Sequence, residues 1–157
     1  MNPLVKMGPW GNGYQTGNKD IYELEIAPLR LESITVHHSS VIEALGFSYR
    51  DRENRPHTAG PWGKVTPGHD TTIMLGPLEF VTEVHGMYGP YYSTFCMADL
   101  TFVTNLRTYG PFGDYGHTPG GWNSFSVPVN KSKGTIVGFF VRAPHHVSEL
   151  GVYVRPF

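Results

Sequence analysis

Gly8-Pro9-Trp10-Gly11 decides how this chain is organised, because it recurs as Gly60-Pro61-Trp62-Gly63 and as Gly110-Pro111-Phe112-Gly113. The first residues of the three copies lie 52 and 50 residues apart. A repeat of this length is typical of one supersecondary unit copied around an axis. A leucine follows each opening glycine after 37 to 40 residues, at Leu45, Leu100 and Leu150. The chain therefore contains three related units, each marked near both ends.

The amino-acid composition fits one folded domain and excludes several kinds of partner. Hydrophobic residues make up 39% of the 157 residues, whereas charged residues make up only 16% and the formal net charge is −1. A chain with so little charge has no long-range field that would attract nucleic acid or an anionic membrane. Because a unit of about 50 residues cannot bury a core by itself, we expect residues 1–157 to form a single domain.

Cys96 is the only cysteine, so the chain has neither an intramolecular disulfide nor a cysteine-rich zinc site. No base or positive charge stands next to it, and we expect a buried structural thiol. No cofactor is predicted. The N-terminus has no apolar run of signal-peptide length, and no later segment is long enough for a transmembrane helix. The sequence therefore predicts a soluble, cytoplasmic or nucleocytoplasmic protein.

Short runs of β-branched and aromatic residues with period-two alternation fill the sequence between the glycine-rich openings, which are themselves interpreted as turns. The best helical candidate, 32–45, is rich in Thr, Val and Ile and contains His-His-Ser-Ser, which favours a strand and a turn. The fold class is therefore all-β. The predicted longer strands are 33–37, 41–49, 78–85, 97–104, 135–142 and 147–154. The predicted shorter strands are 22–26, 71–75, 107–109 and 124–129.

Three sheets that are each apolar on one side can bury those sides together by closing around a common axis. We therefore predict a prism of three four-stranded antiparallel sheets. A β-sandwich or a small barrel is the alternative for strands at this spacing. The threefold copy number argues against both, because a sandwich of two sheets would divide three units unevenly.

Any ligand site is expected in the loops at one end of the prism, because a rigid β-scaffold holds such loops in place. Each unit contributes its opening loop and the turn between its last two strands. Two residues before the marker leucine, the turn of the first unit carries Glu43, that of the second Ala98, and that of the third Ser148. Glu43 is therefore the only carboxylate at this position of the repeat.

Five phrases, in this order along the chain, form a recognisable set: 5–11, 108–113, 125–129, 136–140 and 150–154. Together they resemble the plant jacalin-related lectins, most closely the mannose-binding branch, and the resemblance covers nearly the whole chain. It implies a β-prism of three Greek-key sheets with pseudo-threefold symmetry, a shallow sugar site and no metal ion. It also implies a homodimer and a role in plant defence or stress responses.

In this family, a Gly-x-x-x-Asp turn offers backbone amides and a carboxylate to the sugar, and a neighbouring Gly-Gly loop offers another amide. A hexose suits such a site because each hydroxyl can donate to a carboxylate and accept from an N–H group. The main family site corresponds to the turn of the third unit, where Pro144 replaces the glycine and Ser148 the acid. The residues assigned to this first candidate site are Gly13, Tyr14, Gly17, His145, His146, Val147 and Ser148.

A second candidate site corresponds to the turn of the first unit and the opening loop of the second. Ser39 occupies the glycine position and Glu43 keeps an acid, whose carboxylate reaches about 1.5 Å farther than that of Asp. The residues assigned to it are Ser39, Ser40, Val41, Glu43, Lys64 and Gly68. The expected ligand is mannose or a related glucose- or galactose-type hexose, free or in a glycan. The alternative is a prism scaffold that binds protein, or no sugar at all.

The histidine pairs at 37–38 and 145–146 are not expected to form a metal site, because adjacent strand residues point to opposite faces. His145 and His146 either line the rim of a sugar site or are solvated turn residues. Catalysis is not predicted either. A glycosidase needs two carboxylates across a cleft, and nothing in the sequence brings a second acid to Glu43.

The aromatic residues divide into two groups. Trp10, Trp62 and Phe112 recur at one position of every copy, and this regularity favours a packing role. Tyr14 and Trp122 lie outside the repeated pattern. They are therefore the better candidates for stacking on the C–H face of a sugar.

Overall fold

Strands and their connections make up the structure, a computed structural model that describes residues 3–11, 20–115 and 120–157. These ranges contain no α-helix, which confirms the all-β prediction. None of the described residues therefore belongs to a helix of the kind that crosses a bilayer. The strands are β1 (Val5–Gly11), β2 (Ile21–Tyr22), β3 (Pro28–His38), β4 (Ile42–Asp51), β5 (Pro56–Gly63), β6 (Asp70–Met74), β7 (Val81–Tyr91), β8 (Thr94–Thr104), β9 (Thr108–Phe112), β10 (Asn123–Pro128), β11 (Gly134–Arg142) and β12 (Glu149–Pro156).

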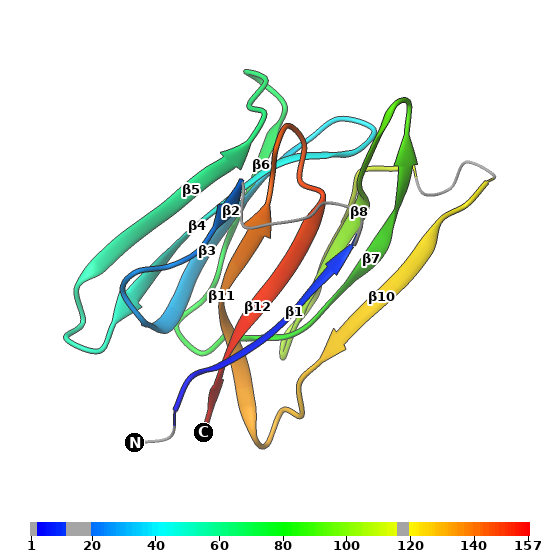
Figure 1. Cartoon of the computed structure of the whole chain (residues 1–157). Coiled ribbons are helices and arrows are strands. Elements are labelled where there is room, and N and C mark those ends of the chain that lie inside the picture. Colours follow the sequence, from blue (N-terminus) through cyan, green and yellow to red (C-terminus); the bar gives the residue numbers. More distant parts are fainter. Residues whose placement is uncertain (1–2, 12–19, 116–119) are drawn as a thin grey trace.

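The strands form three antiparallel groups of four, in the orders β5-β4-β3-β6, β9-β8-β7-β10 and β1-β12-β11-β2 (Figure 1). In the first two groups three consecutive strands pair and the fourth returns beside the first, which is a Greek key; the third group has the same arrangement, with β1 and β2 taking the places of the third and fourth strands. Strand pairing joins the second and third groups at one residue pair among the described residues, Val81 with Ile136, so that they form a single eight-stranded sheet. The three-sided prism predicted from the repeat is confirmed.

The sheets and the sequence repeats are out of phase. Strands β1 and β2, from the start of the chain, complete the sheet made by β11 and β12 at its end. The marker leucine of each unit therefore pairs with the aromatic residue that opens the next unit around the prism. These pairs are Leu45 with Trp62, Leu100 with Phe112, and Leu150 with Trp10.

The interpretation of the repeated phrases as turns is wrong, because the first two lie within the edge strands β1 and β5, and the third lies in the edge strand β9 as far as Phe112. The pairing register of each strand shifts at its Gly-Pro dipeptide, and all three Gly-Pro bonds are cis. Proline cannot donate to a sheet ladder, so edge strands and bulges are where a sheet tolerates it. The dipeptide thus interrupts regular pairing, which resumes at the following aromatic residue.

Several strand boundaries also differ from the prediction; the predicted 33–37, for example, is Pro28–His38, and the predicted 147–154 is Glu149–Pro156. Strand β7 begins at Val81 and not at Leu78, which lies in a connection and is 82% exposed. Pro77 precedes Leu78, and the Glu79 amide donates to the Gly76 carbonyl in a tight turn. Strand β2, Ile21–Tyr22, shares only Tyr22 with the predicted strand 22–26. At Leu78, turn geometry prevails over the apolar composition.

The core lies along the axis of the prism, where each sheet contributes a phenylalanine to one aromatic cluster. Phe139 packs edge-on against Phe47, at 5.3 Å between ring centroids, and against Phe102, at 5.8 Å. All three rings are at most 2% exposed. Trp10, Trp62 and Phe112 pack around this core and are partly buried, as the repeat predicted. The prism therefore has a rigid interior on which its end loops are mounted.

Candidate functional site

The connections expected to carry function lie together at one end of the prism (Figure 1). They are the β3–β4, β7–β8 and β11–β12 turns, the loop that follows β5 and residues 113–115 after β9. Because all three sheets have the same strand order, each turn lies beside the end of the edge strand of its own sheet. For the loop after β5 and the described residues after β9, the sequence-based placement at one end is correct. The opening loop of the first unit, 12–19, lies outside the described residues.

The last glycine of each repeated phrase brings these loops and turns into contact. Each has a positive φ, and a Cβ at any of them would lie within 2.4 Å of a carbonyl oxygen in the facing turn. Glycine is required for so close an approach. The added Cβ would lie 2.4 Å from the Ser148 oxygen at Gly11, 2.2 Å from the Glu43 oxygen at Gly63, and 2.3 Å from the Ala98 oxygen at Gly113.

The second candidate site occupies the seam between β4 and β5. Ser39 begins the β3–β4 turn, and its amide donates to the Val41 carbonyl at 3.0 Å. Val41 is fully buried, so its side chain belongs to the core and is not exposed to a ligand. Lys64 is exposed and starts the partner loop, where its amide donates to the Glu43 carbonyl at 3.0 Å. Gly68 is exposed in the same loop.

Glu43 is the residue of this seam that carries an unmet hydrogen-bonding requirement. The residue is only 6% exposed, yet its Oε2 makes no hydrogen bond to any described residue. Leaving a buried polar atom without a partner costs about 1–3 kcal/mol, and such atoms are rare in folded proteins. A hydroxyl group from a ligand would supply the missing donor.

The first candidate site uses its polar groups within the protein. Ser148 is 1% exposed, and its hydroxyl and amide both donate to the Arg142 carbonyl, at 3.1 and 2.9 Å. Val147 is fully buried, whereas His145 is exposed on the rim. The residues Gly13, Tyr14 and Gly17 lie outside the described part of the chain. The Ser148 hydroxyl is thus already committed to its own turn.

The two candidate sites meet across the β11–β12 turn. The Val147 amide donates to the Ile42 carbonyl at 3.3 Å, so the neighbouring residues His146 and Glu43 flank one hydrogen bond. Burial lowers the pKa of His146, the adjacent His145 lowers it further, and the charge of Glu43 opposes the shift. Nδ1 of His146 is buried without a partner among the described residues. The neutral imidazole therefore offers a second unsatisfied atom beside Glu43.

A row of aromatic rings, which the sequence analysis did not bring together, leads away from His146. Tyr91 lies edge-on to His146 at 5.6 Å and to Tyr115 at 4.8 Å, and Tyr115 lies edge-on to Trp122 at 5.3 Å between ring centroids. Trp122, singled out from the sequence, is half-buried, and its Nε1 has no partner among the described residues. The adjacent aromatic residues Tyr91 and Tyr92, at the turn of the second unit, are the feature of the sequence from which part of this row could have been predicted.

The loop after β9 is attached to the β3–β4 turn. The amides of Asp114 and Tyr115 both donate to the Ser40 carbonyl, at 2.9 and 2.8 Å. Ser40, assigned to the second candidate site, therefore also anchors the aromatic row. Elements from all three sheets thus converge on one rim around Glu43 and His146.

Metal binding and thiol chemistry find no support at this end. Within residues 3–11, 20–115 and 120–157, no three His, Cys, Asp or Glu side chains are grouped as metal ligands would be. His38 instead forms a hydrogen bond through Nε2 with the Thr71 hydroxyl at 2.9 Å. Cys96 is fully buried, as predicted, and burial raises the pKa of its thiol to about 12. A thiol with such a pKa is not a nucleophile at neutral pH.

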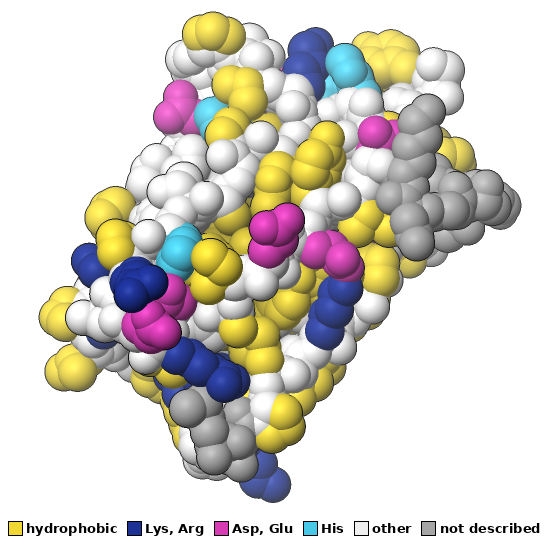
Figure 2. All heavy atoms as spheres, turned by 60° about the vertical axis from the view of Figure 1, so that its left-hand side comes forward, with side chains coloured by type: hydrophobic (Ala, Val, Ile, Leu, Met, Phe, Trp, Pro, Cys, Tyr) yellow, Lys and Arg dark blue, Asp and Glu magenta, His cyan; other side chains and the backbone are white. Residues whose placement is uncertain are grey.

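The surface charge is mixed as well as small. On the face shown in Figure 2, acidic and basic side chains lie in small groups among neutral and hydrophobic ones. Lys6 and Glu23 form one exposed ion pair on the surface.

Three Greek-key sheets in a prism, with paired loops at one end, define the class of β-prism lectins. The chain belongs to the jacalin-like lectin domain family, which matches residues 7–153. Horcolin of Hordeum vulgare is 33% identical over 99% of this chain and 100% of its own length. AcmJRL, a mannose-binding jacalin-related lectin from Ananas comosus, superposes with a TM-score of 0.83 at 35% identity, covering 98% of this chain and 99% of its own. A mannose-specific jacalin-related lectin from Morus nigra in complex with mannose gives a TM-score of 0.78 at 26% identity, covering 98% and 96%.

Proposed function

We propose that the chain binds mannose or a related hexose at the rim where the β3–β4 turn meets the loop after β5. The observation that carries this proposal is the buried, unpartnered Oε2 of Glu43. Two similar solved structures are of mannose-binding lectins. The proposal places the sugar at the second candidate site, because the corresponding hydroxyl of the first, on Ser148, is already bonded to Arg142.

The chemistry of the rim suits a ring of hydroxyl groups. One sugar hydroxyl would donate to the Glu43 carboxylate, and a second would donate to the neutral Nδ1 of His146. A hydrogen bond to an ionised carboxylate is worth about 1.5–3 kcal/mol. Tyr91 and Trp122 would cover the C–H face of the sugar or of the next residue of a glycan.

The affinity for one sugar should be low. A hexose has about 12 non-hydrogen atoms, which at about 0.3 kcal/mol each corresponds to a Kd in the millimolar range. Useful retention would then require several sites acting together. The homodimer implied by the family resemblance would provide them, and sedimentation velocity measures that state directly.

The experiment is retention on immobilised mannose and galactose and on a glycan array, with a set of matched variants. Glu43→Ala should lower retention by about 10- to 100-fold, the loss expected for one charged hydrogen bond. Glu53→Ala removes an exposed carboxylate at the opposite end of β4 and should change nothing. If retention survives Glu43→Ala but responds to Ser148→Asp, the first candidate site binds the sugar instead.

The alternative function, a prism that binds protein or no sugar, is not favoured by the family and its mannose-binding members. It would be supported by a folded wild-type chain that is retained on no sugar. Catalysis is not proposed, since the family that matches the chain is one of lectins.

A further inference from the structure

A cavity lies at the end of the prism opposite the sugar rim. It is a cleft of about 230 Å³, formed where the start of β3, the 75–80 connection, the start of β11 and the end of β12 meet. Its lining is mostly apolar and includes Leu31, Leu78, Phe80, Ile136 and Val137. None of these residues belongs to either candidate sugar site. The cleft therefore calls for an explanation of its own.

Two arginines bring positive charge to this apolar cleft. Arg30 donates through Nη2 to the Gly76 carbonyl at 2.8 Å, and Arg155 donates through Nε to the Leu29 carbonyl at 2.7 Å. Each guanidinium has five donors, and one backbone hydrogen bond fixes its orientation while leaving the others for a ligand. Neither arginine forms an ion pair with a carboxylate among the described residues.

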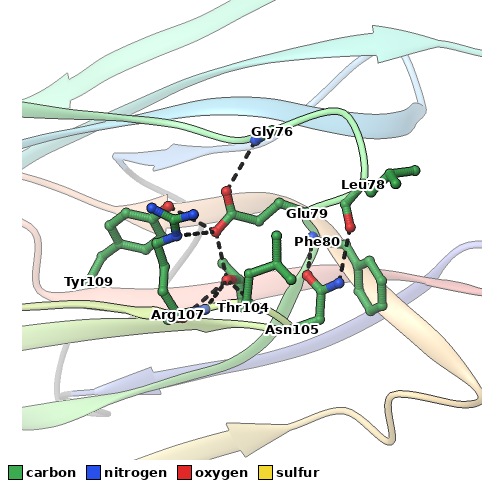
Figure 3. A network of polar contacts seen from close by, with 9 residues as sticks. Gly76, Leu78, Glu79, Phe80, Thr104, Asn105, Arg107 and Tyr109 are labelled. Atoms are coloured by element: carbon green, nitrogen blue, oxygen red, sulfur yellow. Dashed lines mark hydrogen bonds and ion pairs between the residues drawn. The ribbon is translucent and has the colours of Figure 1, made fainter.

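The acid that lines the cleft, Glu79, is occupied by its own network (Figure 3). Its Oε1 accepts from the Gly76 amide at 3.1 Å, and its Oε2 accepts from the hydroxyls of Thr104 at 2.7 Å and Tyr109 at 2.8 Å. Burial raises the pKa of Glu79, but these hydrogen bonds and the charge of Arg107 at 3.5 Å outweigh it and lower that pKa. Glu79 is therefore ionised, and Arg107 is its counter-ion.

The same network makes the wall of the cleft rigid before any ligand arrives. Asn105 accepts from the Phe80 amide at 2.9 Å and donates to the Leu78 carbonyl at 3.0 Å, as Figure 3 shows. The side chain of Leu78 is nevertheless 82% exposed at the mouth of the cleft. A fixed backbone that presents an uncovered leucine favours binding, because little ordering entropy remains to be lost.

We propose that this cleft binds a small apolar molecule with one carboxylate group. The carboxylate lies between the guanidinium groups of Arg30 and Arg155, where charge-assisted hydrogen bonds hold it. The hydrocarbon part lies against Phe80 and Ile136 and is covered by Leu78. The cavity has the volume of about eight water molecules, which suits a phenyl ring with a short acid chain.

The test titrates the ¹⁵N-labelled full chain with 4-phenylbutyrate and, separately, with the neutral 4-phenylbutan-1-ol, while amide shifts are recorded by NMR. The acid should bind at least tenfold more tightly than the alcohol and shift the amides of 76–80 and 155–157. Equal affinities would contradict the role of the arginines. The absence of shifts in those segments at 10 mM acid would overturn the proposal altogether.

Single-residue variants then test which positive charges bind the carboxylate. Arg30→Gln and Arg155→Gln should each weaken acid binding about tenfold and leave alcohol binding unchanged, whereas Arg52→Gln, an exposed arginine outside the lining, should have no effect. If Arg52→Gln weakens binding as much as they do, the site is not this cleft. If a cleft variant fails to fold, the comparison of acid with alcohol on the unaltered chain still decides. Retention on mannose should be unchanged throughout, so this proposal and the sugar proposal can fail separately.

Discussion

Replacing Gly63 by alanine should destabilise the protein far more than the same change at Gly68. Both glycines have a positive φ, +123° and +81°, which costs an alanine about 1–2 kcal/mol. At Gly63, however, the new Cβ would lie 2.2 Å from the Glu43 carbonyl oxygen, whereas at Gly68 nothing lies within 4 Å. Relieving that overlap costs about 1–3 kcal/mol and breaks the Lys64–Glu43 hydrogen bond, worth about 0.5–1.5 kcal/mol. We expect a loss of about 4 kcal/mol for Gly63→Ala and about 1.5 kcal/mol for Gly68→Ala.

Urea unfolding followed by circular dichroism measures both free energies of unfolding, and thermal melting gives an independent value. A difference of about 2.5 kcal/mol corresponds to about 5–10 °C in Tm for a chain of this size. The Gly68→Ala variant controls for backbone strain alone, because it lies in the same loop. If the two variants are equally stable, the close approach of loop and turn is not what requires the repeated glycine.

Three further outcomes are expected. Glu43→Gln should leave Tm unchanged or raised while it weakens sugar retention, because the buried carboxylate has no donor; a clear fall in Tm would contradict this. Burial lowers the pKa of His146 in the folded state. The wild-type chain should therefore lose stability as the pH falls from about 6.5 to that lowered pKa, and His146→Asn should remove this part of the pH dependence. Phe139→Ala should cost about 3–5 kcal/mol in urea unfolding, since its ring is fully buried between two other sheets; a loss below 1 kcal/mol would exclude it from the core.

The repeat and the alternation of side chains were enough to predict three sheets around one axis. They did not reveal that each phrase such as Gly60-Pro61-Trp62-Gly63 lies within a strand, because glycine and proline normally interrupt strands. A bulge on an edge strand removes this conflict, and edge position depends on the tertiary arrangement. The pairing of Leu150 with Trp10 likewise joins opposite ends of the chain, which no local pattern contains.

The candidate site could be predicted in part. Glu43 and its turn followed from the position of the marker leucine, since homologous turns occupy equivalent places in each sheet. The burial of Ser148 could not be predicted, because it depends on how the β11–β12 turn folds back on the Arg142 carbonyl. The contact of His146 with the seam beside Glu43 could not be predicted either, because it depends on a hydrogen bond between two sheets, from Val147 to Ile42. The ring contacts of Tyr91 and Tyr115 depend in the same way on loops that meet only at the end of the prism.

The most direct measurement of the central claim is an NMR titration of the ¹⁵N-labelled chain with methyl α-mannoside. Binding at the rim predicts amide shifts at 39–43, 64–68 and 145–147 that saturate together at millimolar ligand, and that disappear in Glu43→Gln. Shifts confined to the opposite end of the prism, or a titration unaffected by Glu43→Gln, would contradict the account.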